Sequence, residues 1–164
     1  MFKKILVPTD GSTLSDLAIT KAIAFAKSIN AVVYGFHAAP DYAITIHGVD
    51  LHSSEKFRDL ADDEARNYLA GIEAKAKEAG ISCTTGFAVS ASPYRAIIDA
   101  AKEQDCDLIF MASHGRRGLA GLLLGSETQK VLTHCHIPVL VFRDKSTERS
   151  IREAMEAEMN DFRT

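Results

Sequence analysis

The sequence lacks the features that mark several specialised classes of protein. No apolar run approaches the roughly 18 residues that indicate a membrane-spanning helix. No broad basic field is present, since 19 Lys and Arg stand against 22 Asp and Glu for a formal charge of −3. This balance disfavours general binding to nucleic acid. The three cysteines are odd in number and form no C-x-x-C pair, so neither a disulfide framework nor a zinc site is indicated.

A secretory leader is not indicated either. Lys3 and Lys4 could mimic the charged start of a signal peptide, but the apolar stretch between them and Pro8 is only three residues long and no small-residue cleavage site follows. We therefore expect a mature N-terminal strand in a cytoplasmic protein. The 164 residues are 46% hydrophobic and 25% charged, which is the balance of one ordinary globular domain. No linker divides the chain.

Strand and helix patterns alternate along the chain. Short apolar runs predict strands, and apolar residues at helical spacing predict helices between them. The predicted strands are 5–7, 31–37, 81–89, 106–111 and 137–142; the predicted helices are 12–29, 57–79, 93–101 and 126–134, with 39–50 irregular. The helix signals include Ser12 or Thr13 and Ser126 as N-caps, Ser92 before Pro93, and Asn30 and Gly80 as stops.

Alternating strands and helices predict an α/β fold, a single-domain doubly wound open sheet of five parallel strands. The strands are continuous apolar runs, which is typical of a sheet covered on both faces. Such sheets bind ligands beyond the carboxyl ends of their strands, where the strand order reverses. The candidate site is therefore built from residues 8–10, after the first strand, and residues 112–115, after the fourth.

Residues 112–126 (ASHGRRGLAGLLLGS) hold four glycines in one strand-to-helix connection. Glycine lets backbone amides approach a ligand closely, and a helix start presents unpaired amides and a positive dipole end. Together these predict a phosphate cradle. There is no G-x-x-x-x-G-K-[ST] and no G-x-G-x-x-G after the first strand, so a P-loop is excluded and a standard dinucleotide fold is not supported. From these residues alone, a plain glycine-rich surface loop remains the alternative.

The same residues resemble the universal stress protein family, whose nucleotide-binding members carry the motif G-x2-G-x9-G-[ST]. Gly115 matches the second glycine, nine residues intervene, and Gly125-Ser126 closes the motif, whereas Ala112 replaces the first glycine. The Ala112 methyl group either crowds a ribose or fits on a backbone of negative φ. Residues 3–12, 36–38, 113–116 and 136–141 resemble further family segments in the same order.

The resemblance covers residues 1–143 as a nucleotide-binding domain, followed by an extension, 144–164, with helical spacing. It implies strand order 3-2-1-4-5 and bound ATP, with Mg held through the phosphates and no metal bound directly by the protein. Asp10 would lie near the ribose, and the Ala38 backbone near the adenine. The predicted nucleotide-binding residues are Pro8, Thr9, Asp10, Ala38, Met111, Ala112, Ser113, His114, Gly115, Arg116, Arg117, Gly118, Gly125, Ser126, Glu127 and Thr128.

The last strand is an apolar sheet edge, which invites pairing with another chain. The resemblance likewise implies a homodimer through this strand, with Pro138, Val139, Leu140, Val141 and Phe142 at the interface. In the extension, Ser150 and Glu153 match a capping box, and we expect either a frayed tail or an amphipathic helix that docks on the dimer.

No catalytic residue is expected. Ser113 and His114 are adjacent, so strand-like side chains would diverge and would not form a hydrogen-bonded pair. Residues 134–136 (HCH) have poor spacing for zinc. The expected function is that of a cytoplasmic ATP-binding universal stress protein that regulates an unknown protein partner, without membrane insertion. The alternatives are a dimeric interaction module with a vestigial nucleotide site, or a slow ATPase.

Overall fold

The computed structural model describes residues 1–40, 45–46, 49–50, 55–115 and 124–144. Its main sheet contains β1 (Lys4–Thr9), β2 (Val32–Pro40), β5 (Cys83–Ser90), β6 (Leu108–Ala112) and β7 (Val139–Phe142). All neighbouring strands are parallel, in the order β5-β2-β1-β6-β7. Counted along the chain within this sheet, the order is 3-2-1-4-5, which confirms the predicted architecture.

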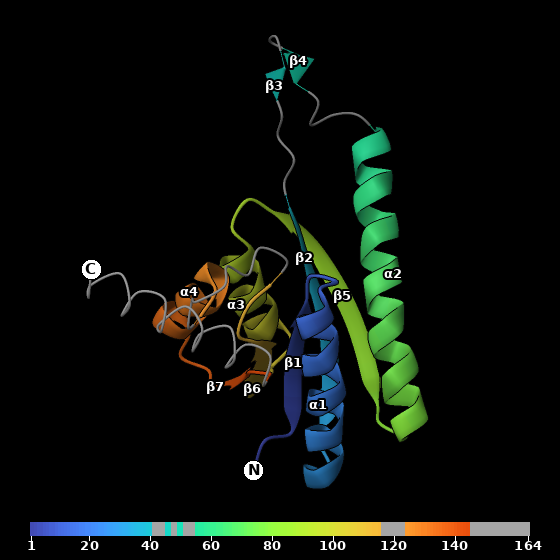
Figure 1. Ribbon diagram of the computed structural model, residues 1–164, viewed down its shortest axis with the longest axis vertical. Coiled ribbons are helices and arrows are strands. Elements are labelled where there is room, and N and C mark those ends of the chain that lie inside the picture. The colour runs from blue at the N-terminus through green and yellow to red at the C-terminus, as the bar shows by residue number, and fades with distance from the viewer. Residues whose placement is uncertain (41–44, 47–48, 51–54, 116–123, 145–164) are drawn as a thin grey trace, which may run out of the picture.

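Helices cover both faces of the sheet. On one face lie α1 (Thr13–Ile29) and α2 (Glu55–Ala79), and on the other lie α3 (Pro93–Glu103) and α4 (Ser126–His134) (Figure 1). One core cluster joins Val7, Val33 and Phe110 to α1 and α2; a second joins Leu6 and Ile109 to α3 and α4. Successive strand residues therefore point into opposite cores, which explains the continuous apolar runs.

The ends of α1 are fixed by residues that the sequence identifies. Ser12 is the N-cap, and its hydroxyl accepts a hydrogen bond from the Ser15 amide at 3.2 Å. Asn30 ends the helix with a left-handed φ of 56°, and its amide donates to the carbonyl oxygens of Ala26 and Lys27. Gly80 ends α2 with a φ of +73°. These bonds satisfy backbone groups that the helix ends leave unpaired.

Several predicted boundaries are wrong by a few residues. Gly125, rather than Ser126, is the N-cap of α4, and the Ser92 side chain makes no capping bond on α3. The third strand of the main sheet begins at Cys83 rather than at Ile81, because the Ile81 amide donates a hydrogen bond to the Ala76 carbonyl at the end of α2. Within the stretch predicted to be irregular, β3 (Thr45–Ile46) pairs with β4 (Val49–Asp50) as a small antiparallel hairpin.

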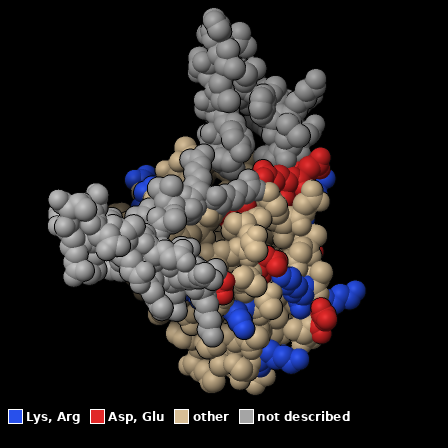
Figure 2. Space-filling model, in the orientation of Figure 1, with Lys and Arg blue, Asp and Glu red and all other residues tan. Residues whose placement is uncertain are grey.

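The charge distribution on the described surface and the state of the cysteines are those of an ordinary globular domain. Lys and Arg are interspersed with Asp and Glu on the described part of the face that carries α1 and α2 (Figure 2). Among the described helices, none combines the length and the apolar character needed to cross a bilayer. The three cysteines are free, and burial raises the pKa of the Cys106 thiol to about 11, so this thiol is protonated at neutral pH.

Two glycines have open space around them, so replacing each with alanine tests the effect of backbone conformation without a change in packing. A Cβ would meet nothing within 4 Å at either Gly71 or Gly80, but only Gly80 has positive φ. Gly80→Ala should lower the free energy of unfolding by about 1 kcal/mol, because L side chains are strained in the left-handed region. Gly71→Ala should raise it by about 0.5–1 kcal/mol, because Gly71 lies within α2. Urea denaturation measures both, and equal effects of the two changes would contradict the assigned conformations.

Candidate functional site

The carboxyl ends of β1 and β6 meet at Asp10 and Gly115. The two strands pair directly, with Ile5 opposite Leu108 and Leu6 opposite Ile109. Beyond the pairing, the Cα of Gly115 lies so close to Asp10 that an added Cβ would overlap the carboxylate Oδ2. The structure thus brings the two predicted halves of the site together, and any side chain at residue 115 would require the Asp10 carboxylate to move.

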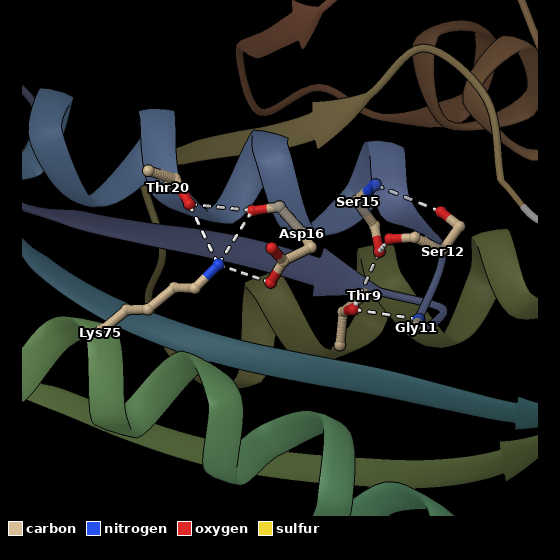
Figure 3. A network of polar contacts seen from close by, with 7 residues as sticks. All are labelled: Thr9, Gly11, Ser12, Ser15, Asp16, Thr20 and Lys75. Atoms are coloured by element: carbon tan, nitrogen blue, oxygen red, sulfur yellow. Dashed lines mark hydrogen bonds and ion pairs between the residues drawn. The ribbon is translucent and has the colours of Figure 1, made fainter.

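The turn after β1 is held by a network of hydroxyl groups (Figure 3). The Gly11 amide donates to Thr9 Oγ1, which bonds Ser15 Oγ at 3.1 Å, and the Ser15 hydroxyl donates to the Ser12 carbonyl. The Asp10 carboxylate accepts from the Ser12 amide at 3.0 Å through Oδ1. These bonds fix the Asp10 backbone at the sheet edge and couple it to the start of α1.

A histidine of β2 and a tyrosine of α2 contact the turn that follows β1. His37 is 3% exposed on β2, opposite Thr9 at the end of β1, and its Nδ1 donates to the Thr9 carbonyl at 2.8 Å. The Tyr68 ring of α2 packs edge-on against His37 at 5.2 Å between centroids. Gly11, with φ of +75°, leaves room for Tyr68, because a Cβ there would overlap the tyrosine ring. The predicted set of nucleotide-binding residues includes neither His37 nor Tyr68, although a histidine within a buried strand beside the switch point is a usable signal.

The start of α4 lies beside the same sheet edge. The Gly125 amide donates to the Ser113 carbonyl at 2.8 Å, and a Cβ on Gly125 would lie 3.3 Å from His114 Cα. Among the described residues, no side chain caps the first turn of α4. Ser126 is exposed at the first helical position. The first amides of this helix are therefore available to an anion, and the helix dipole favours one there.

Ala112, which replaces the first motif glycine, has an ordinary strand backbone and packs into the core. Among the described residues, Asn30 and Asp105 are the non-glycine residues with positive φ, so Ala112 has an ordinary strand conformation. Its methyl group is 8% exposed and belongs to the core cluster on the α1 face, with Phe110. The replacement of the first motif glycine is thus accommodated by the hydrophobic core.

Ser113 and His114 do form a hydrogen bond, contrary to expectation. Ser113 Oγ lies 3.1 Å from His114 Nδ1. The prediction was wrong because β6 ends at Ala112, so the side chains of the following residues no longer alternate across a pleat. Ser113 is fully buried, and its hydrogen bond to His114 holds the backbone just after β6 in place.

Three predicted ligand residues are engaged by the protein itself. The Met111 side chain is 5% exposed within the core cluster on the α3 and α4 face. The buried Thr128 hydroxyl donates to the Ala112 carbonyl at 3.1 Å. The Glu127 carboxylate accepts from the Tyr94 amide at the start of α3 and from Lys130 Nζ. Only the backbone amides of Glu127 and Thr128 thus remain for a ligand.

Two buried nitrogens lack a hydrogen-bond partner among the described residues. They are Nε2 of His37 and Nε2 of His114, and both side chains are at least nine-tenths buried. His37 lies on β2 opposite the end of β1, and His114 follows the end of β6. Arg116, Arg117 and Gly118 lie outside the described residues. No cluster of three metal-ligating side chains occurs in the described part of the chain.

The Thr128 contact predicts a measurable stabilisation. Thr128→Val leaves the buried Ala112 carbonyl without its side-chain donor and should lower the free energy of unfolding by about 1–2 kcal/mol. Thr133→Val is the matched control, because its hydroxyl bonds the Gln129 carbonyl at an exposed position of the same helix. We expect the control to change stability by less than about 0.5 kcal/mol. Similar losses in both variants would contradict a role of Thr128 in joining α4 to β6.

The chain was compared with known proteins. Residues 1–143 match the universal stress protein family. Universal stress protein MJ0531 of Methanocaldococcus jannaschii is 32% identical over 151 residues, which cover 90% of this chain and 86% of that protein. YxiE of Bacillus subtilis is also 32% identical, over 87% of this chain and all of that protein.

Solved structures show the same fold. The structure of MJ0577 from the same archaeon superposes with a TM-score of 0.75 at 30% identity, covering 88% of this chain and 98% of that one. A universal stress protein of Archaeoglobus fulgidus in complex with dAMP gives a TM-score of 0.64 at 20% identity, covering 86% and 98% of the two chains. From the matched family and these relatives, we conclude that the chain belongs to the universal stress protein family.

Proposed function

We propose that this chain is a cytoplasmic ATP-binding protein that regulates a partner according to nucleotide occupancy. The observation that carries the proposal is the uncapped start of α4, with Gly125 as its N-cap beside the Asp10–Gly115 contact. A helix start with free amides and no side chain over it suits a phosphate. The free cysteines are in keeping with a reducing compartment.

The arrangement suggests a role for each part of the site. The amides of Ser126, Glu127 and Thr128 would hold phosphate oxygens, with the exposed Ser126 hydroxyl beside them. Asp10 would accept hydrogen bonds from ribose hydroxyls, and the backbone near Ala38 would meet the adenine. The unpartnered Nε2 of His114 supports the fit, because a bound group at this edge would supply the missing partner.

The relatives support a nucleotide ligand. One solved universal stress protein is a complex with cAMP and another is a complex with dAMP. Both ligands carry adenine and phosphate, joined through ribose in cAMP and through deoxyribose in dAMP. Mg, where present, would be held through phosphate oxygens rather than by a protein ligand set.

The buried Ser113 hydroxyl favours binding over catalysis as the primary role. Ligand binding to a site at the meeting point of β1, β6 and α4 would shift the conformational equilibrium of the surface that a partner meets. A dimeric interaction module without a nucleotide, and a slow ATPase, are the competing functions.

A thermal melt with Mg-ATP, and with AMP as the comparison, tests the proposal. Ligand at about a hundred times its dissociation constant adds roughly 2.7 kcal/mol, which should raise the midpoint by about 5–10 °C. The rise should be larger with ATP than with AMP. Gly115→Ala should abolish the ATP-dependent rise, because the added methyl group overlaps the Asp10 carboxylate. Gly71→Ala, which meets open space, is the control and should keep the rise. An unchanged midpoint of the unaltered protein at millimolar ATP would favour the interaction module.

We further propose a homodimer through β7. This strand is a sheet edge whose residues are all half-buried, and Pro138, which lacks an amide hydrogen, stands just before it. Val141 pairs with Met111 but belongs to neither core cluster, so it is the β7 residue that is least committed to the core.

Val141→Lys should convert the dimer to a monomer, because a charged side chain on an edge strand opposes pairing. Sedimentation equilibrium should give twice the chain mass of 17.8 kDa for the unaltered protein and the single mass for the variant. Val32→Lys, at a 37% exposed position on β2, should stay dimeric. A monomeric unaltered protein at micromolar concentration would reject the dimer.

A further inference from the structure

The opposite edge of the sheet is a second unpaired strand. β5 has eight residues, with no charge and no proline, and no strand of the described chain pairs with its outer side. Phe87 and Val89 are 40% and 53% exposed on it. Natural edge strands usually carry charges, prolines or bulges that prevent pairing, and β5 has neither charge nor proline.

A groove of about 520 Å³ runs between β5 and α3. Its floor includes Phe36 and Ala88, and its α3 wall presents Asp99 and Glu103 one helical turn apart. Neither carboxylate forms an ion pair with another described residue. Arg95, the cation that lines the groove, is turned onto Tyr94, with Nε 2.8 Å from the tyrosine hydroxyl.

The two faces of the sheet beside β5 differ in chemistry: one presents exposed apolar side chains of β5, and the other presents carboxylates of α3. Phe87 pairs with His37, whose ring contacts Tyr68 of α2, so Phe87 and Val89 lie on the α2 face. Ala88 pairs with Ala38, and both pack against the core cluster that contains α3. Ala88 therefore lies on the opposite face of β5, beside Asp99 and Glu103. A strand added beside β5 alternates in the same way.

We propose that the β5 edge and this groove bind an extended segment of a partner protein in which apolar and basic residues alternate. The added strand pairs with the free backbone groups of β5. Its apolar side chains cover Phe87 and Val89, and its Lys or Arg side chains reach Asp99 and Glu103. A second copy of β5 does not fit this description, because that strand has no charge to offer the carboxylates. The inference is independent of the proposed nucleotide site.

The probe for this proposal is a fluorescein-labelled eight-residue peptide of alternating valine and lysine, titrated into the full chain and followed by anisotropy. A peptide of the same composition with four valines followed by four lysines is the control for charge alone. We expect the alternating peptide to bind at least tenfold more tightly than the block peptide, and more weakly in 0.5 M salt. Binding should also slow hydrogen exchange of the outer amides of β5.

Matched variants test whether the peptide binds in this groove. Asp99→Asn combined with Glu103→Gln should weaken binding about tenfold while keeping the shape of the wall. Glu78→Gln, on the exposed end of α2, should change it less than twofold. Val89→Lys should also weaken binding, whereas Val32→Lys should not.

Four results would overturn the proposal. The first is no binding of the alternating peptide at millimolar concentration, and the second is equal binding of the block peptide. The third is no effect of removing both carboxylates. The fourth is slow exchange of the outer β5 amides in the free chain, which would mean that the chain itself or a second copy already covers this edge.

Discussion

The close contact between Gly115 and the Asp10 carboxylate is the constraint on which the site depends. The first strand lies between β2 and β6, and the crossover after it uses α1 on one face while α3 leads into β6 on the other. The connections therefore diverge at the carboxyl end of β1 and leave a ligand position there. A side chain at residue 115 would displace Asp10, so the absence of a Cβ keeps the two halves together.

Around this contact, most buried polar side chains form hydrogen bonds that hold the backbone in place. Thr9, Ser15 and His37 hold the turn after β1, while Thr128 and the Gly125 amide fasten α4 to the end of β6. Glu127 links α4 to the start of α3 through the Tyr94 amide. The Lys75–Asp16 ion pair between α2 and α1 is exposed and adds little stability by comparison. Among the described residues of the site, the backbone amides at the start of α4 are thus the main groups that remain for a ligand.

Much of the fold could be predicted from local signals. Ser12, Asn30 and Gly80 mark helix ends because their capping and left-handed conformations are properties of single residues. The strand order came from the family resemblance, since alternation alone does not fix which strands are neighbours. The contacts of Thr128, Glu127 and Tyr68 with other elements are not predicted from the sequence, because their partners are distant along the chain. Ser113 and His114 were misjudged because strand geometry was extended one residue too far.

The most direct test of the account is a ¹⁵N-edited NMR titration of the full chain with Mg-ATP. The account predicts that the largest amide shifts fall on Gly115, Gly125, Ser126 and Glu127, where the end of β6 meets the uncapped start of α4. Smaller shifts should follow at Asp10 and Ala38. Shifts confined to other surfaces, or none at millimolar ATP, would contradict the claim that this edge of the sheet is a nucleotide site.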